Sequence, residues 1–351
     1  MSRLKYVYTP RRRAQAAARG ARVSLPPILL APALLVVVLG AWWLARDSGS
    51  SEPAKEPAVL AASCAAGKAC SSATPAPGAG SATARPRQQL APAGGDAPPP
   101  ITGTSALVVE EPCGGTLFEQ NPHLSVPPAS LTKIMTALVA VDHTEPDEIV
   151  LIEVNGPELS LETDSTVMGI EPGMRLSMRD LLYGLLLPSG NDSAIQIAEY
   201  VAGGVPAFVR MMNEKATALG LTDTHFTNPH GLDDAALYSS ASDMVTMGRA
   251  LLNDPDLAQI VRTSTYQPAW DGPALQNLNL LLGFYEGAIG VKTGYTDLAG
   301  QTIVAAAERD GRRIIASVMG AQTDIYADAS GLLEWAFSET DPACAPARPA
   351  T

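Results

Sequence analysis

The chain has 351 residues, and 46% of them are apolar, which is enough for one large hydrophobic core or two joined ones. Seven of the 24 basic side chains lie in residues 1–24, where there is no acidic residue. The other 17 face 36 acidic side chains, so the rest of the chain has a net charge of −19. A body this acidic repels phosphate backbones, which argues against a nucleic-acid partner. Four cysteines without a C-x-x-C motif are too few for a disulfide framework and do not suggest zinc, so no metal or cofactor is predicted.

The N-terminal region has the pattern of a membrane anchor. An uncharged run of 18 residues, 28–45, follows the basic segment 1–27. As a helix it would span about 27 Å, close to the hydrocarbon thickness of a bilayer. Trp42 and Trp43 lie at its outer end, where indoles prefer the interface. The basic flank predicts a cytoplasmic N-terminus, so the protein is expected in the cell membrane with a single span and an extracytoplasmic body.

Two other interpretations of this region compete with a retained anchor. A cleaved signal peptide has the same order of basic and apolar segments. The long basic segment and the terminal tryptophans favour the anchor. A lipobox ending at Cys64 is disfavoured, because charged residues precede it instead of an apolar stretch.

The rest of the chain divides by composition. Residues 46–103 are rich in Ala, Pro, Gly and Ser, which predicts a disordered spacer. A folded domain is expected over 104–338, followed by a flexible tail, 339–351. Strands are expected at the two ends of that domain: 106–110, 116–119, 289–293, 301–308 and 313–320. Helices are expected between them and after the last strand: 130–143, 176–187, 193–202, 206–219, 242–252 and 324–337.

This order of elements predicts the fold class. Strands at both chain ends with helices between them indicate a mixed α/β fold of the α+β kind. The antiparallel sheet would be built from both chain ends, and a helical lobe would be inserted in the middle. Asp310-Gly311 is expected to form the tight turn between the last two strands.

The first chemical motif is Ser130-Leu-Thr-Lys133, at the start of a predicted helix. Positions i and i+3 share one helix face, so the Lys133 amine can reach the Ser130 hydroxyl. A serine needs a base to become a good nucleophile, and a lysine can serve if burial or a nearby cation lowers its pKa. Taken alone, an S-x-x-K pattern also fits a capping serine with a solvated lysine.

The second and third motifs are also weak when taken singly. Ser189-Gly190-Asn191 lies between two apolar helices and could place a hydroxyl and an amide in a cleft, or simply form a turn with a capping residue. Lys292-Thr293-Gly294 ends a predicted strand, where a cation and a hydroxyl suit a peptide with a free carboxylate. A glycine there lets the ligand approach the backbone closely.

The three motifs together are much more specific. Ser189 follows Ser130 by 59 residues, and Lys292 follows Ser189 by 103. A set in this order is known from penicillin-binding proteins and class A β-lactamases. From about residue 105 to 337 the chain resembles the low-molecular-mass penicillin-binding proteins, which are serine-type D-Ala-D-Ala carboxypeptidases with a β-lactamase/transpeptidase-like fold. The resemblance is carried by four blocks: 128–137, 180–192, 224–232 and 290–296.

The resemblance implies roles for the matching positions. Ser130 would attack the carbonyl between the two terminal D-alanines and form an acyl-enzyme, with Lys133 as base. Ser189 would relay a proton to the leaving amine. Asn191 would hold the acyl chain or Lys133. The remaining residues implied by the resemblance, all substrate-binding, are Lys292, Thr293, Gly294 and Tyr295.

The same resemblance implies partners and leaves rival functions open. Peptidoglycan stem peptides would be the substrate, and β-lactam antibiotics would acylate the same serine. A DD-endopeptidase or transpeptidase remains an alternative, because sequence does not fix the acyl acceptor, as does a non-catalytic module that senses β-lactams or binds the wall. A class A β-lactamase is disfavoured, since Gly190 stands where those enzymes have Asp and no E-x-x-L-N follows.

Histidines and cysteines receive a structural interpretation. His225 and His230 are expected to be hydrogen-bonded structural residues, and no partner is evident for His123. Disulfides between Cys113 and Cys344, or within the spacer, are left open.

Overall fold

The computed structural model describes residues 97–112, 115–270 and 272–339. The predicted segments 1–27 and 28–45, most of the spacer and nearly all of the tail therefore lie outside the described residues. All the cysteines lie outside them as well. In the described part of the chain, no helix has both the length and the apolar run needed to cross a membrane.

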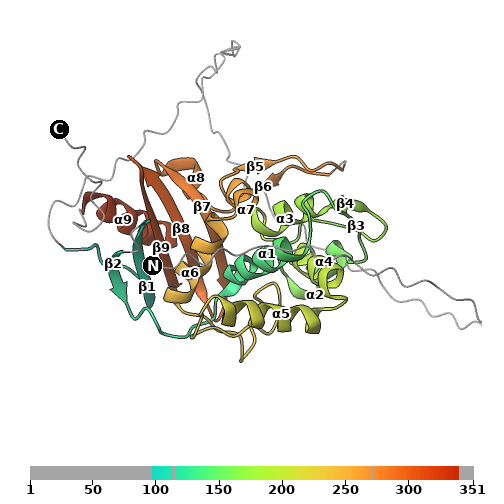
Figure 1. Cartoon of the computed structure of the whole chain (residues 1–351), viewed down its shortest axis with the longest axis horizontal. Helices are drawn as coiled ribbons and strands as arrows, with labels where there is room; N and C mark the ends of the chain where they lie inside the picture. The colour runs from blue at the N-terminus through green and yellow to red at the C-terminus, as the bar shows by residue number, and fades with distance from the viewer. Residues whose placement is uncertain (1–96, 113–114, 271, 340–351) are drawn as a thin grey trace, which may run out of the picture. The chain divides into compact units, whose positions relative to one another are not determined.

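A five-stranded antiparallel sheet forms the centre of the fold, in the order β2-β1-β9-β8-β7 (Figure 1). The first strands of the domain pair with the last ones, since Val108 lies opposite Ala316 across β1 and β9. This arrangement confirms the predicted fold class. The strands are β1 (Ser105–Glu111), β2 (Gly115–Gln120), β7 (Ala288–Thr296), β8 (Gly300–Arg309) and β9 (Arg312–Ala321).

Helices cover both faces of this sheet, which explains why its inner strands are buried over most of their length. On one face α9 (Ile325–Ser338) packs against β8 and β9. On the other face lies α6 (Ala241–Leu252), and α1 (Thr132–His143) packs against α6 and joins it to the helical lobe. Burying a large aliphatic side chain stabilises a fold by roughly 1.5–3 kcal/mol, so these two apolar layers supply most of the driving force.

The helical lobe is inserted between β2 and β7, as Figure 1 shows. The expected helices are all present, within a few residues of their predicted bounds, except that the first begins at Thr132 after a 3-10 turn over Ala129–Leu131. Short elements were not predicted, because a few residues give too little periodicity. The further elements of the lobe and its flank are α2 (Gly156–Thr163), α3 (Met178–Leu186), α4 (Asn191–Ala202), α5 (Val205–Ala218), α7 (Pro255–Val261), α8 (Leu281–Phe284), β3 (Ile149–Leu151), β4 (Arg175–Ser177), β5 (Thr265–Tyr266) and β6 (Leu275–Gln276).

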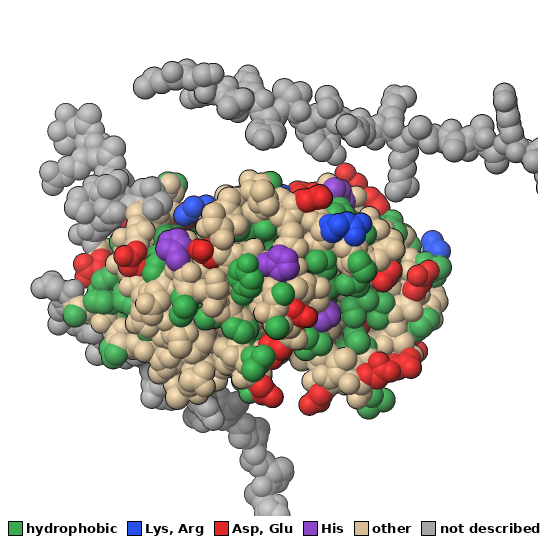
Figure 2. All heavy atoms as spheres, turned by 90° about the horizontal axis from the view of Figure 1, so that it is seen from below, with side chains coloured by type: hydrophobic (Ala, Val, Ile, Leu, Met, Phe, Trp, Pro, Cys, Tyr) green, Lys and Arg blue, Asp and Glu red, His purple; other side chains and the backbone are tan. Residues whose placement is uncertain are grey.

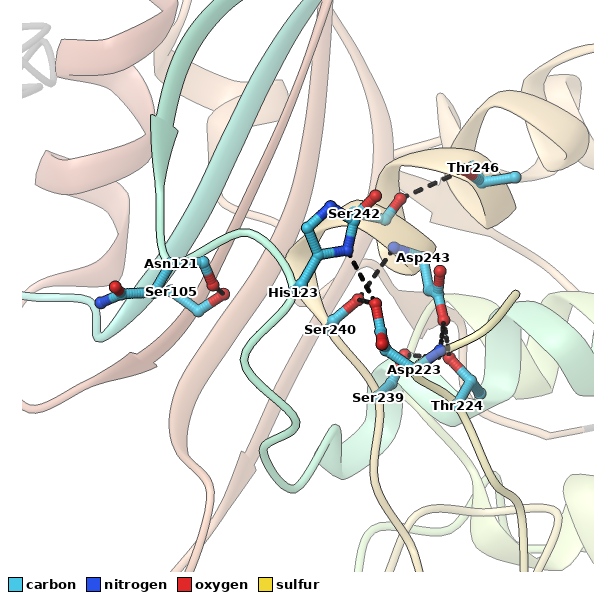
Figure 3. Close-up of polar contacts among 10 residues, drawn as sticks. All are labelled: Ser105, Asn121, His123, Asp223, Thr224, Ser239, Ser240, Ser242, Asp243 and Thr246. Atoms are coloured by element: carbon cyan, nitrogen blue, oxygen red, sulfur yellow. Dashed lines mark hydrogen bonds and ion pairs between the residues drawn. The ribbon is translucent and has the colours of Figure 1, made fainter. Parts of the chain in front are cut away.

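A polar cluster joins the segment after β2 to the start of α6 (Figure 3). His123 does have a partner, contrary to the expectation, because its Nδ1 lies 2.8 Å from the carboxylate of Asp223. Asp243 accepts hydrogen bonds from the backbone N of Asp223 (2.8 Å) and from the Thr224 hydroxyl (2.7 Å). Asp223 lies 100 residues from His123 in sequence, so the sequence pattern could not reveal this pair. These contacts fix the base of the segment 223–240.

The surface agrees with the acidic composition. On the face shown in Figure 2, acidic side chains cover more of the surface than basic ones. Several of the described arginines are paired with glutamates; Arg249 bonds Glu111, and Arg312 bonds Glu110. The acidic balance is therefore carried by solvated surface carboxylates.

Candidate active site

Ser130 lies in the 3-10 turn that precedes α1. Two prolines, Pro127 and Pro128, lead into this turn, and Ala129 adopts a left-handed conformation with φ of 49°. The turn is packed closely from the outside, because a Cβ on Gly231 would overlap the carbonyl oxygen of Ala129. The backbone position of the half-buried Ser130 is thus fixed by the packing of this turn.

Lys133 is fully buried on the first turn of α1, and its amine has three partners. The Nζ atom lies 3.0 Å from Ser130 Oγ, 2.7 Å from Asn191 Oδ1 and 2.7 Å from the carbonyl oxygen of His230. The amide and carbonyl oxygens only accept hydrogen bonds. A neutral amine would donate its two N–H groups to them, and its lone pair would then face the hydroxyl of Ser130. This arrangement suits a base.

The electrostatics favour that neutral form. Burial holds the pKa of Lys133 well below its ordinary value, and the positive charge of Lys292 lowers it further, while Asp192 opposes the shift. Burial likewise lowers the pKa of Lys292 to about 7. The pKa of His230 falls to about 3 through burial and the charge of Lys133. The imidazole is therefore neutral at physiological pH and adds no positive charge to the site.

The second motif forms the turn between α3 and α4. Ser189 is buried with a left-handed φ of 65°, and its hydroxyl has no hydrogen-bond partner among the described residues. Gly190 has no room for a side chain, since a Cβ would lie 2.7 Å from Asp192 Oδ1 and 2.9 Å from the carbonyl oxygen of Gly184. Asn191 does not cap α4 with its side chain but turns its amide oxygen to Lys133. The motif thus presents one free hydroxyl and one fixed amide.

The third motif lies on β7, the edge strand of the sheet. Lys292 is buried and donates a hydrogen bond to the carbonyl oxygen of Thr293 at 2.9 Å. A Cβ on Gly294 would come within 2.8 Å of the backbone N of Ser130, so the strand passes very close to that turn. The side chain of Tyr295 is 65% exposed. The free edge of β7 therefore runs directly past Ser130.

A cleft of about 790 Å³ unites the three motifs. The predicted site residues that line it are Ser130, Ser189, Asn191, Thr293, Gly294 and Tyr295. Lys133 and Lys292 are buried beside it, each in contact with a lining residue. The structure thus brings together all the site residues that the sequence predicted. Acyl transfer to a serine needs a base beside the nucleophile, a group that can pass on a proton and a surface that holds the substrate. Here these are the buried amine of Lys133 beside Ser130, the unpartnered hydroxyl of Ser189 and the free edge of β7.

Comparison with known proteins decides the family. The sequence model of the D-alanyl-D-alanine carboxypeptidases, Peptidase S11, matches residues 93–323. The chain belongs to this family. D-alanyl-D-alanine carboxypeptidase DacF of Bacillus subtilis is 36% identical over 245 residues, which cover 67% of this chain and 62% of the relative. DacB2 of Mycobacterium tuberculosis is 38% identical over 242 residues, covering 66% of this chain and 81% of the relative.

Solved structures of similar proteins have the same fold. The DD-transpeptidase of Streptomyces K15 superposes with a TM-score of 0.66 at 29% identity, covering 70% of this chain and all of the other, 100%. A D-alanyl-D-alanine carboxypeptidase of Mycobacterium tuberculosis gives 0.66 at 35% identity, covering 72% and 97%. The chain spans less than two thirds of the length of DacF, 62%.

Sequence reasoning missed three contributors to the candidate site of this chain. The backbone carbonyl of His230 holds Lys133, although His230 was given only a structural role. Thr166 donates its hydroxyl to the carbonyl oxygen of Ser189 at 2.9 Å and so braces the second motif. Asp233 accepts a hydrogen bond from Thr296 across the cleft mouth. His230 belongs to the block 224–232, which marked this stretch as similar to the family. Its contact is made by a backbone oxygen, however, so the residue type could not reveal it.

Proposed function

We propose that this chain is a serine-type D-Ala-D-Ala carboxypeptidase that removes the terminal D-alanine from peptidoglycan pentapeptides through an acyl-enzyme on Ser130. One observation carries the proposal: a buried lysine amine lies 3.0 Å from a serine hydroxyl while two oxygens occupy its other hydrogen-bonding positions. The family of the chain supports the same reaction.

In the acylation step, Lys133 takes the proton of Ser130 as its oxygen attacks the carbonyl of the penultimate D-alanine. The negative charge that develops on the carbonyl oxygen is accepted by the backbone N–H groups of Ser130 and Tyr295. The close passage of β7 at Gly294 supports this pairing, since it brings the strand to the backbone N of Ser130. The electrostatic gain is made only in the transition state.

The leaving group then departs as the free amino acid. The C–N bond breaks, and the amine of the terminal D-alanine takes a proton that Ser189 relays from Lys133. The hydroxyl of Ser189 is suited to this relay, because it has no hydrogen-bond partner in the described part of the chain. Water next attacks the ester carbonyl and gives a proton to Lys133. The bond between the acyl carbon and Ser130 Oγ then breaks, and Lys133 returns the proton to Ser130 Oγ. The products are the shortened peptide acid and the regenerated Ser130 hydroxyl.

The substrate carboxylate is assigned to the third motif. Lys292 and Thr293 lie on the edge strand, where a peptide can lie alongside β7. A cation in this buried position attracts the terminal carboxylate, and the bound carboxylate in turn keeps the lysine charged. In this proposal, the carboxylate would lie near Thr293 and the scissile carbonyl near Tyr295, which follows the order of these residues along β7. β-Lactams, which carry a comparable carboxylate, would acylate Ser130 from the same position.

The acyl acceptor has a second candidate. The similar Streptomyces K15 protein is named a DD-transpeptidase, so an amine from a second peptide, instead of water, could take the acyl group here, as in a transpeptidase. A DD-endopeptidase would hydrolyse a cross-link with the same residues. A non-catalytic β-lactam sensor would acylate but not turn over. All three share the acylation step, and the acceptor separates them.

The location of the protein is part of the proposal. The 18-residue apolar run 28–45, with basic residues before it, supports a single-pass anchor in the cell membrane. The spacer would let an extracytoplasmic catalytic domain reach the wall. Full-length protein should remain with membranes after an alkaline wash, and a protease added outside should cleave the domain. Release by the wash would contradict the anchor.

The enzymatic proposal is tested by labelling and by turnover. Full-length protein should be labelled covalently by fluorescent penicillin, whereas Ser130→Ala should not. D-alanine should be released from a pentapeptide ending in D-Ala-D-Ala, with and without an added amino-acid acceptor. Release with water alone supports the carboxypeptidase, while product formed only with the amine supports the transpeptidase. Labelling without either product would refute the carboxypeptidase and leave the sensor or the endopeptidase, of which only the endopeptidase would cleave a cross-linked peptide. No labelling would refute all of these functions.

A further inference from the structure

Asp233 lies at the mouth of the cleft and connects its two sides. Its Oδ1 accepts a hydrogen bond from the hydroxyl of Thr296 at 2.7 Å, and its Oδ2 lies 3.4 Å from the backbone N of Leu298. Thr296 ends β7, and Leu298 belongs to the turn that leads into β8. The hydroxyl of Thr296 also accepts from the backbone N of Ala299 at 3.1 Å. The Asp233 carboxylate thus contacts two residues of the β7–β8 turn, and one of them, Thr296, bonds a third.

The segment that carries Asp233 is itself anchored at both ends. At its base, the backbone N of Asp223 donates to the Asp243 carboxylate, and the Asp223 carboxylate lies 2.8 Å from His123 Nδ1, as Figure 3 shows. Two isolated bridges, His225 with Tyr238 and Val126 with Ser239, hold its two limbs. The position of Asp233 is therefore set by the fold and not by the turn that it contacts.

The tip of the same segment touches the nucleophile and the base. The carbonyl of His230 binds Lys133 at 2.7 Å, and Gly231 packs directly on the turn that carries Ser130. Two residues after Gly231, Asp233 reaches Thr296, which follows Tyr295 on β7. One segment thus contacts both Lys133 and the strand that supplies an N–H group for the oxyanion.

We propose that Asp233 is a positioning residue, which holds the β7–β8 turn through Thr296 and thereby sets the backbone N–H of Tyr295 opposite Ser130. The inference rests on the proposed function, because it concerns the acylation of Ser130. Tyr295 needs such support, since its own side chain is 65% exposed and makes little packing. β7 is also an edge strand, with a neighbouring strand on one side only.

The effect should fall on the transition state. A donor that is displaced by a fraction of an ångström still allows a ligand to bind, but it stabilises the developing negative charge less well. A small misplacement of this kind costs roughly tenfold to a hundredfold in rate. Because Asp233 is solvent-exposed, its loss should scarcely affect folding.

The test measures penicillin acylation of the full chain, with the non-covalent binding constant and the acylation rate constant determined separately. Asp233→Ala and Thr296→Val each remove the same hydrogen bond, from opposite ends. Each should lower the acylation rate constant about tenfold or more and change the binding constant by less than about threefold. The loss in the double variant should be much smaller than the product of the two single losses, as expected for two residues that share one main contact.

Two further variants separate positioning from general damage. Asp233→Asn keeps an oxygen that can accept from Thr296 but puts an amide near the backbone N of Leu298, so it should restore much of the rate. Asp234→Ala, at the next position, removes a carboxylate that bonds the backbone N of Ala236 and should acylate like the wild type. The thermal midpoint of each variant should stay close to that of the wild type.

The outcomes distinguish this inference from the proposed function. Wild-type protein that is not acylated at Ser130 would refute the proposed function. Wild-type acylation together with an unchanged rate constant in Thr296→Val and Asp233→Ala would refute the inference alone. Additive losses in the double variant, or losses that follow the thermal midpoint, would also overturn it. If Asp233→Ala does not fold, Thr296→Val decides the matter by itself.

Discussion

The carbonyl oxygen of His230 lies 2.7 Å from Nζ of Lys133, although 97 residues separate them in the chain. Together with Asn191 Oδ1, it occupies two of the amine's hydrogen-bonding positions. Neither oxygen carries a charge, so neither holds a proton on Lys133 as a carboxylate would. Burial then keeps the pKa of Lys133 low, and the amine is left as a base beside Ser130.

Replacing the neutral amide by a carboxylate should therefore impair the base. Asn191→Asp would put a negative charge at the position that is now 2.7 Å from Nζ of Lys133. Such a charge raises the pKa of Lys133, so the acid limb of the acylation profile should move to higher pH. At pH 7 the rate should fall roughly tenfold or more, since one pKa unit is a factor of ten.

The measurement for Asn191→Asp is the rate of penicillin acylation between pH 5 and 10. Asn253→Asp, an exposed substitution at the end of α6, adds the same charge far from the cleft motifs and should leave the profile unchanged. A profile of Asn191→Asp that coincides with that of the wild type would contradict the assignment of Lys133 as base.

The pH profile should also have an alkaline limb, set by Lys292. Burial lowers the pKa of Lys292 to about 7, so the free protein loses this positive charge as the pH rises through that value. A substrate with a terminal carboxylate should then bind less well, and kcat/KM should fall above about pH 7. In the complex the carboxylate raises the pKa of Lys292, so the limb in kcat should appear at higher pH.

The control for this prediction is a peptide whose terminal carboxylate is amidated. It has no charge to pair with Lys292, so it should react poorly, and its kcat/KM should lack the alkaline limb. An equal limb for both peptides would assign that titration to another group.

Gly294 is predicted to tolerate no side chain. A Cβ at this position would lie 2.7 Å from Thr302 Oγ1 and 2.8 Å from the backbone N of Ser130, and the backbone of that 3-10 turn cannot yield as a flexible side chain can. Gly294→Ala should push β7 away from Ser130 and lower the acylation rate about a hundredfold. Gly283→Ala in α8 is the matched control, because nothing lies within 4 Å of its added methyl group. Similar acylation rates in both variants would refute the close approach.

Part of this architecture could be predicted because it depends on local patterns. The long strands β8 and β9 are apolar runs joined by Asp310-Gly311, both with positive φ, as the two-residue turn requires. The long helices have clear start and stop residues, and the three motifs are recognisable by residue type. These features gave the fold class and all the predicted site residues.

The remainder depends on contacts that residue types do not encode. His230 acts through its carbonyl oxygen, which every residue has, so only the path of the backbone could identify it. Asp233 meets Thr296 across 63 residues of chain, and either residue alone looks like an ordinary surface side chain. The start of α1 was placed two residues early, because the left-handed Ala129 and the 3-10 turn follow from packing against Gly231.

Asp192 should be the most important of the buried carboxylates for stability. It is fully buried, and its oxygens accept hydrogen bonds from four backbone N–H groups, three of them in the loop 168–170. Asp192→Ala would leave these donors unsatisfied, so the free energy of unfolding should fall by about 3 kcal/mol or more, as measured by urea titration. Asp324→Ala removes an exposed cap with two such bonds at the start of α9 and should cost only about 1 kcal/mol.

The loop 168–170 leads back to Thr166, which braces Ser189, so Asp192→Ala should also slow the turnover of the protein that remains folded. Equal losses of stability in the two variants would mean that the loop does not depend on this carboxylate.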